Sequence, residues 1–282
     1  DESGYTVGEA QQTKMAAMEA MWDTQPAPAG LALVAGIDEQ AQRNDWEIEI
    51  PWVLGLIGTR SVDKVIPGIR QIKARNRERI LNGIEAVVAL EALRKHRDDE
   101  AAKAAFERYK ADLGFGLLLK KYVVDVRQAT PQMIQKAVDD TIPRVTPMFW
   151  AFRLMVAAGF AMLALFVLAF WQTLRGHCGG KRWLLHWAVW MLPVPWIASE
   201  LGWFVAEYGR QPWTIYGVLP THLSVSTLTV DSLYGSLAGF IGFYTLLLVV
   251  EVYLMVKFAR QGPGSLGTGR YDREVVHTAV NA

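Results

Sequence analysis

The stretch FWAFRLMVAAGFAMLALFVLAFWQ, residues 149–172, decides the fold class of this chain. It carries a single charged residue, Arg153, in its 24 positions. A helix needs about 20 mostly apolar residues to cross the hydrocarbon core of a bilayer. The stretch therefore predicts a transmembrane helix over residues 149–174.

Two further stretches are apolar enough to cross a membrane. Residues 183–205 are interrupted by Pro193, Pro195 and Glu200, and proline is tolerated in membrane helices when neighbouring groups satisfy the freed carbonyls. We therefore expect a second, kinked span there and a third span over residues 233–258. Small residues recur along the third span at a spacing that favours close helix contact, at Gly235, Gly239 and Gly242.

The charges of the short loops predict an orientation. The loop RGHCGGKR, residues 175–182, and the tail, residues 259–282, are basic, and basic loops stay on the cytoplasmic side. The external loop that contains GRQPW, residues 206–232, and the region before residue 149 are then extracytoplasmic. Tryptophans near the expected span ends are typical of the membrane interface: Trp150, Trp171, Trp183, Trp203 and Trp213.

The first 148 residues contain no apolar span and predict a helical region in two parts, residues 1–60 and 61–148. Thr130 before Pro131 predicts a helix start. Apolar residues with helical spacing predict two amphipathic helices, one with Ile80, Ile84, Val87 and Val88, the other with Ala102, Phe106, Tyr109 and Leu113. The predicted fold class is an all-α membrane protein with three transmembrane helices and a large extracytoplasmic helical loop domain.

Composition excludes several classes of partner. Hydrophobic residues make up 51% of the chain, and the formal net charge of +1 shows no cationic surface for nucleic acid. Cys178 is the single cysteine, which excludes an internal disulfide and leaves too few ligands for a zinc site. The opening DESGYTVGEA has no basic and apolar leader, so we expect the chain to begin inside a loop.

Polar residues inside the spans have two interpretations each. Charges in a bilayer are costly and often functional. Arg153 either extends to the interface or binds an anionic cofactor group. Met155 is either core packing or a thioether ligand of a haem iron, for which Gly159 one turn on would leave room. Glu200, Trp203 and Glu207 lie on one helical stripe, which should face a cofactor, a proton path or a partner helix unless Glu207 is interfacial.

Four motifs carry a resemblance to a known family. GRQPW, residues 209–213, is followed by LPT at 219–221; the others are the opening 28 residues, LGFGLLLKKY at 113–122 and KFARQGPGSLGTGRY at 257–271. Together they resemble the C-terminal half of subunit I of the cytochrome bd type quinol oxidases, in the branch with a long quinol-binding loop. The resemblance extends over essentially the whole chain.

The resemblance implies a respiratory terminal oxidase that oxidises ubiquinol or menaquinol outside the membrane and reduces dioxygen to water with cytoplasmic protons. Its location would be the bacterial inner membrane, with the quinol loop periplasmic and the C-terminus cytoplasmic. Its cofactors would be low-spin and high-spin haem b and haem d. Its partners would be the N-terminal half of subunit I, subunit II, small single-helix subunits and membrane lipid.

Site residues follow from the same resemblance. Lys14 and Glu19 occupy loop positions associated with quinol, although five residues of ideal helix separate them by about 140°, so that both reach one ring only at a helix end or turn. Met155 matches the axial methionine of the low-spin haem, with Arg153 beside that haem and the histidine on its other face in the N-terminal half. Glu207 would lie near the oxygen-side haems. Arg210 would bind a propionate or the loop, and Trp203 shares the cofactor-facing stripe.

Two other function classes remain open from the residues alone. A non-catalytic membrane anchor or assembly subunit of a respiratory complex would also have three spans and interaction helices. A transporter would have paired inverted halves, and no internal repeat is visible in the chain.

Overall fold

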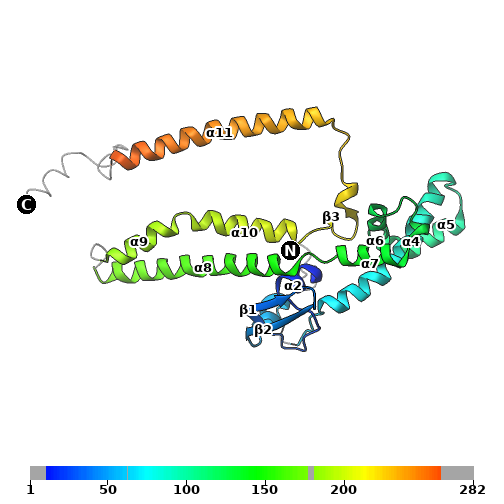
Figure 1. Ribbon diagram of the computed structural model, residues 1–282, viewed down its shortest axis with the longest axis horizontal. Coiled ribbons are helices and arrows are strands. Elements are labelled where there is room, and N and C mark those ends of the chain that lie inside the picture. The colour runs from blue at the N-terminus through cyan, green and yellow to red at the C-terminus, as the bar shows by residue number, and fades with distance from the viewer. Residues whose placement is uncertain (1–10, 62, 177–180, 262–282) are drawn as a thin grey trace, which may run out of the picture. The chain divides into compact units, whose positions relative to one another are not determined.

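The computed structural model describes residues 11–61, 63–176 and 181–261 (Figure 1). Cys178 and the motif residues before 11 and after 261 lie outside the described residues. The chain divides into two compact units, Asp1–Val225 and Ser226–Ala282. Three of its helical stretches are long and apolar enough to cross a membrane, so the predicted class of helical membrane protein is confirmed.

The first unit opens with the short helix α2, Gln12–Met18, and a β-hairpin that the all-helical prediction did not foresee. Strand β1, Leu31–Asp38, pairs antiparallel with β2, Arg43–Ile50. Apolar and acidic residues alternate in WEIEI at 46–50, the period of two that suits a strand. The Asp38 side chain accepts hydrogen bonds from the backbone of Gln40 and Ala41 and so closes the turn. Helix α3, Val53–Thr59, follows.

Two side chains fix the end of α2 against this hairpin. The indole N–H of Trp22 donates to the Asn44 side chain at 3.0 Å, and the Asn44 amide donates to the Ala20 carbonyl at 3.1 Å. Further along, the Glu39 carboxylate accepts a hydrogen bond from the backbone N–H of Thr146 at 2.6 Å. A carboxylate is favourable at a helix N-terminus, so the hairpin also caps the first long apolar helix.

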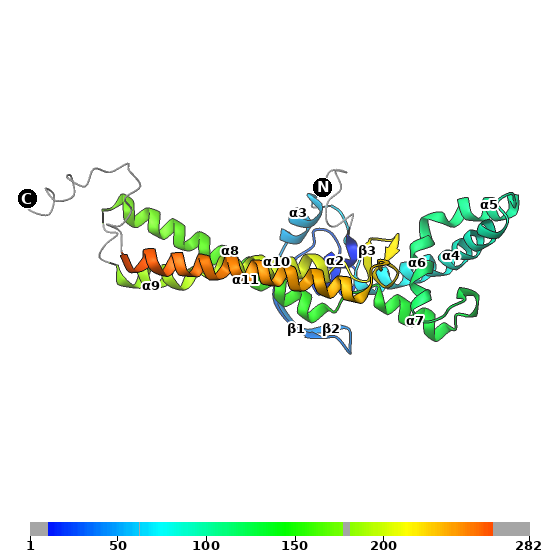
Figure 2. The same ribbon diagram turned by 90° about the horizontal axis from the view of Figure 1, so that it is seen from above.

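The second part of the region is a group of packed helices (Figure 2). Ala102, Phe106 and Tyr109 share one helix as predicted, but Leu113, expected on the same helix, begins a separate short one. Ile80 and Val87 of the longest helix are fully buried. The hydroxyl of Thr130 accepts a hydrogen bond from the backbone of Met133, which confirms the predicted cap. The helices are α4, Ile69–Lys95; α5, Glu100–Tyr109; α6, Leu113–Leu117; and α7, Pro131–Asp140, with 3-10 turns at Lys110–Asp112, Leu118–Lys121 and Val126–Gln128.

The first two spans lie side by side (Figures 1 and 2). Helix α8 covers Val145–Leu174. The second span consists of α9, Arg182–Met191, and α10, Val194–Tyr208. The break between them falls at Pro193, with Pro195 in the first turn of α10, as the two prolines predicted. A buried cluster of apolar residues joins α2 to the start of α8, including Met15, Met148 and Phe149.

The loop after α10 forms two short paired strands, β3, Trp213–Ile215, and β4, Leu219–Pro220, and the 3-10 turn Thr221–Leu223. Trp213 is buried, with 2% exposure, and its ring packs against Phe115 of α6 at 4.9 Å between centroids. The Trp213 ring therefore packs inside the protein rather than on its surface. The second unit contains α11, Val230–Gln261, which is the third predicted span.

Candidate functional site

A buried ion pair joins the end of α2 to the first span, α8. Glu19 directly follows α2, and the Arg153 guanidinium donates to both of its carboxylate oxygens, at 2.5 and 3.3 Å. The side chains are only 2% and 10% exposed. Two residues that the sequence assigned to different partners, Glu19 to quinol and Arg153 to a haem, therefore contact each other.

Arg153 is held from several sides. Its Nε donates to the Ala32 carbonyl of β1 at 2.7 Å, and its guanidinium carbon lies 4.4 Å from the centre of the Phe149 ring. An aromatic face attracts a guanidinium that has lost water. The three hydrogen bonds of Arg153 use three of the five N–H donors of a guanidinium, which leaves donors for a further anion or carbonyl.

Burial raises the pKa of the Glu19 carboxyl above its ordinary value, while the hydrogen bond and the positive charge of Arg153 oppose that rise. Loss of water disfavours the charged form of a carboxyl, whereas a nearby cation favours it. A carboxyl poised between these effects can accept a proton at a higher pH than a solvated one. This property suits a general base.

The pair forms the polar end of an apolar cavity of about 430 Å³. Glu19 and Arg153 are the ionisable members of its lining among the described residues. Met15 lies so close to Gly58 that a Cβ there would meet the Met15 methyl at 2.0 Å. The remaining walls come from α2, β1, β2, α3 and α8: Met18, Leu31, Leu33, Ile50, Val53, Leu54, Ile57, Phe152, Val156 and Phe160. The cavity suits an apolar ligand with one hydrogen-bonding end.

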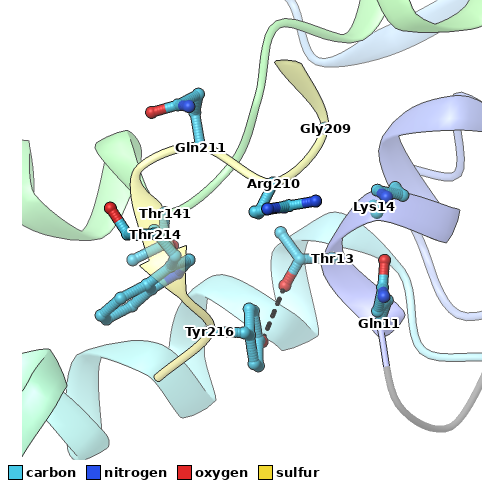
Figure 3. A pocket seen from close by; sticks show the side chains of 10 residues that line it. Gln11, Thr13, Lys14, Thr141, Gly209, Arg210, Gln211, Thr214 and Tyr216 are labelled. Atoms are coloured by element: carbon cyan, nitrogen blue, oxygen red, sulfur yellow. Dashed lines mark hydrogen bonds between the residues drawn. The ribbon is translucent and has the colours of Figure 1, made fainter. Parts of the chain in front are cut away.

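Lys14 lines a different cavity, of about 240 Å³, between α2 and the GRQPW loop (Figure 3). The Lys14 and Arg210 side chains enter it from opposite elements, and the hydroxyls of Thr13 and Tyr216 are 3.4 Å apart. Burial, then the positive charge of Arg210, lower the pKa of Lys14, and Glu207 acts in the opposite direction. This second cavity is polar and suits a small polar or anionic group.

Lys14 and Glu19 are thus not brought to one ligand site. Glu19 is the residue at the C-terminal end of α2, directly after Met18. Positions five apart on an ideal helix differ by about 140°, and the two side chains line different cavities.

Glu207 and Arg210 form an ion pair at 2.9 Å where α10 passes into the GRQPW loop. Both side chains are more than 40% exposed. The Trp203 side chain is 66% exposed among the described residues. The structure therefore joins Glu207 to Arg210, and through the polar cavity to Lys14, while Trp203 of the same helix contributes to neither cavity.

The LGFGL motif approaches this loop closely. A Cβ at Gly114 would lie 2.1 Å from the carbonyl oxygen of Gly217, which lies between GRQPW and LPT and has a positive φ of 70°. Only glycine allows so close a contact between two backbones and adopts such a φ without strain. Beside it, Phe115 of LGFGL packs against Trp213 of GRQPW, so the two motifs meet in the structure.

Met155 turns its thioether toward α10. A Cβ added at Gly202 would lie 3.1 Å from the Met155 sulfur, while a Cβ at Gly159 would meet nothing within 4 Å. The glycine opposite the sulfur and the space at Gly159 fit a soft sulfur ligand beside a flat ring.

The fold and the site together define a class of protein. It is a helical membrane protein with a buried ion pair at the base of an apolar cavity. The family model of cytochrome bd terminal oxidase subunit I matches residues 1–263. The chain belongs to that family.

Curated relatives agree with this assignment. The chain is 42% identical to the cytochrome bd-II ubiquinol oxidase subunit 1 of Escherichia coli strain K12 over 266 residues. These aligned residues are 94% of this chain and 52% of that protein. The chain is 25% identical over 277 residues to the cytochrome bd ubiquinol oxidase subunit 1 of Bacillus subtilis strain 168, covering 95% and 47%. A putative cytochrome bd menaquinol oxidase subunit I of the same Bacillus strain is 24% identical over 263 residues. The chain spans about half the length of these relatives.

Sequence reasoning missed the hairpin wall of the apolar cavity and the partner of Glu19. The alternating WEIEI stretch was a signal for the strand. For the ion pair, the signals were two charges in otherwise apolar surroundings, Glu19 behind MAAM and Arg153 inside a span. Charges in such places need a partner, although sequence alone does not say which one.

Proposed function

We propose that this chain carries the quinol-oxidising site and part of the haem-binding helices of a cytochrome bd type terminal oxidase. The complete complex would oxidise ubiquinol or menaquinol, reduce dioxygen to water and contribute to the proton gradient. The observation that carries the proposal is the Glu19–Arg153 pair at the polar end of an apolar cavity. Family membership and the named quinol oxidases among its relatives support it.

In this site the quinol ring lies in the apolar cavity with one hydroxyl toward Glu19. Oxidation of a quinol to a quinone releases two protons and two electrons. The Glu19 carboxylate accepts one of the protons, and its raised pKa, caused by burial, matches it to that task. The free N–H donors of Arg153 orient the same oxygen, and its charge limits the cost of the buried carboxylate.

Met155, two residues after Arg153, is proposed to hold the low-spin haem b through its sulfur, together with a histidine from the N-terminal half of the subunit. The haem would supply a one-electron acceptor for the electrons of the quinol. Glu207, Arg210 and Trp203 are proposed to lie near the oxygen-side haems, a high-spin haem b and haem d. There the Glu207–Arg210 pair can exchange a proton or bind a propionate.

Lys14 keeps its proposed part in quinol oxidation, but through the polar cavity that it shares with Arg210. Subunit II, small single-helix subunits, the N-terminal half and membrane lipid are the proposed partners. The quinol loop is proposed to be extracytoplasmic and the C-terminus cytoplasmic, in the bacterial inner membrane. The basic loop at 175–182 supports this orientation.

The test is Glu19→Gln in the assembled oxidase, with Glu49→Gln as the matched control because Glu49 is an exposed carboxylate of the nearby hairpin. Loss of a general base lowers the rate by about 100-fold or more. We expect that loss for quinol oxidation, with oxygen uptake from an artificial electron donor retained. A quinol oxidation rate equal to that of Glu49→Gln would refute the proposal.

A further inference from the structure

We propose that Asn44 of β2 is a positioning residue for Glu19. Its side chain holds the residue after Glu19 in a left-handed conformation and so keeps the Glu19 carboxylate at Arg153. The inference rests on the proposed function, because it assigns Asn44 an effect on quinol oxidation through Glu19. Asn44 lines neither the apolar cavity nor the polar one, so it acts through the backbone that follows Glu19 rather than on a ligand.

Helix α2 ends in a tight turn that includes Glu19. The backbone N–H of Ala20 donates to the Ala17 carbonyl at 3.3 Å, and that of Met21 donates to the Ala16 carbonyl at 2.9 Å. This pair of bonds defines the Schellman motif, in which the residue after the helix cap adopts a left-handed conformation. Glu19 is the cap, so the turn sets the direction in which its side chain leaves the helix.

The left-handed residue of this turn is an alanine. Ala20 has a φ of 51°, at a position where glycine is the usual residue because it has no Cβ. A Cβ disfavours the left-handed conformation about 5- to 30-fold. Ala20 is only 2% exposed, so its methyl group packs in the core. The conformation of Ala20 therefore needs support from its surroundings, and residues held in this way are concentrated at functional sites.

The Asn44 side chain supplies that support from the hairpin beside α2 (Figure 1). Its amide nitrogen donates to the Ala20 carbonyl at 3.1 Å and to the Glu47 carboxylate at 2.8 Å. Its oxygen accepts from the Trp22 indole at 3.0 Å. An indole only donates, whereas a carbonyl and a carboxylate only accept, so one orientation of the amide satisfies all three partners. Asn44 thereby fixes the peptide plane that follows Ala20.

The next two carbonyls of the chain are held by the start of α4. The backbone N–H of Ile69 donates to the Met21 carbonyl at 2.8 Å, and that of Arg70 donates to the Trp22 carbonyl at 3.1 Å. With Ala20, three successive carbonyls are bound, and the one nearest to the ion pair is bound by a side chain. A substitution of that side chain can therefore loosen the turn without breaking the backbone bonds to α4.

The ion pair is sensitive to the direction of the Glu19 side chain. Arg153 donates to both carboxylate oxygens of Glu19, whose side chain is 2% exposed. A contact of this kind depends on the relative orientation of the two planar groups. If Ala20 leaves the left-handed conformation, the carboxylate is less often at Arg153, and the rate falls with the fraction of molecules in the competent state.

The test is Asn44→Ala in the assembled oxidase, with kcat/KM for quinol oxidation as the readout. A single neutral hydrogen bond shifts an equilibrium by about 2- to 12-fold, which is comparable to the penalty of a left-handed alanine. We expect kcat/KM to fall about fivefold. Glu47→Ala is the matched control, because it removes the other acceptor of the same amide and leaves the bond to Ala20; it should leave kcat/KM unchanged.

A second variant is available if Asn44→Ala does not assemble. Asn44→Asp is similar in size and keeps an acceptor for the Trp22 indole, but an ionised carboxylate cannot donate to the Ala20 carbonyl. It should lower kcat/KM at least as much as Asn44→Ala.

Two combined variants separate positioning from a general structural role. Ala20→Gly, added to Asn44→Ala, should restore most of kcat/KM, because glycine adopts the left-handed conformation without support. Asn44→Ala, added to Glu19→Gln, should cause no further loss, because the group that Asn44 positions is already absent. A loss that Ala20→Gly does not restore, or that persists in Glu19→Gln, would overturn the inference. Equal rates for Asn44→Ala and Glu47→Ala would overturn it too.

Failure of this inference and failure of the proposed function are distinguishable. If Glu19→Gln slows quinol oxidation and Asn44→Ala does not, the proposed quinol site stands and Asn44 does not position it. If Glu19→Gln leaves quinol oxidation unchanged, the proposed function itself is refuted.

Discussion

Removing one partner of the Glu19–Arg153 pair should cost far more stability than removing an exposed ion pair. Arg153→Met leaves the Glu19 carboxylate, whose side chain is 2% exposed, without its cation. Breaking a buried pair from one side costs about 3–5 kcal/mol, because the remaining charge has lost its water. Replacing both residues, as in Glu19→Gln with Arg153→Met, leaves no buried charge and should cost less than the sum of the two single variants.

A double-mutant cycle measures this difference. We expect a coupling energy of about 2–3 kcal/mol for Glu19 and Arg153, near the upper end for residues in contact. The control cycle uses Lys103 and Glu100, whose side chains are 45% and 83% exposed; exposed pairs one helical turn apart are worth about 0.3–0.5 kcal/mol. Arg153→Lys keeps the charge but loses the forked geometry, so its stability should be intermediate.

The assay is the midpoint of unfolding of the assembled complex in mixed detergent micelles as the denaturing detergent is increased. Free energies of unfolding come from the same titration for all variants. A coupling energy for Glu19 and Arg153 no larger than that of Lys103 and Glu100 would refute the claim that water is excluded from the pair. So would a cost below about 1 kcal/mol for Arg153→Met, the range of surface pairs.

Three further predictions concern the base, the thioether and the loop contact. Burial raises the pKa of Glu19, and only the carboxylate form accepts a proton, so kcat/KM for quinol should fall as the pH drops through that pKa. This acidic limb of the pH profile should vanish in Glu19→Gln. A pH profile of Glu19→Gln identical to that of the unchanged protein would contradict the prediction. Met155→Leu should abolish or convert the low-spin haem b absorbance, whereas Met162→Leu should leave it intact; an unchanged spectrum in Met155→Leu refutes ligation. Gly114→Ala, whose Cβ would lie 2.1 Å from the Gly217 oxygen, should cost about 1–3 kcal/mol by overpacking, seen as a lower melting temperature, while Gly235→Ala, with open space around it, should show no loss; equal melting temperatures would contradict the contact.

Local features of the chain were predictable from its sequence. The spans follow from the length of the apolar stretches, and the break before α10 follows from Pro193 and Pro195, which lack the backbone donor that a helix interior needs. The start of α7 follows from Thr130, whose hydroxyl accepts a bond from the first turn. Each of these depends on residues within a few positions of each other.

The hairpin was not predictable to the same degree. Each of its strands is eight residues long. Ala32 and Ala35 of β1 lie in the buried cluster that also contains residues of α2 and α8, so the hairpin depends on this packing rather than on local preference. Strand preference reflects packing and burial more than the backbone itself. A short apolar stretch without that context is read as helix or loop in a chain that is otherwise helical.

The contacts within the candidate site were not predictable from the sequence either. Glu19 and Arg153 are separated by 134 positions in the chain, and each was assigned a partner outside the chain because no local pattern links them. Lys14 and Glu19 were grouped because they are close in sequence, yet the helix between them turns their side chains to separate cavities. The sequence indicates which single residues are chemically suited to a site. Which of these residues contact each other is set by the packing of α2 on α8.

The most direct test of the central claim is quinol-dependent oxygen uptake by the complete complex that contains this chain, recorded together with its reduced-minus-oxidised absorbance spectrum. The account predicts haem bands and oxygen consumption when quinol is supplied, with the consumption largely lost, and the bands retained, in Glu19→Gln. A complex without haem bands, or one that consumes no oxygen with quinol, would contradict it.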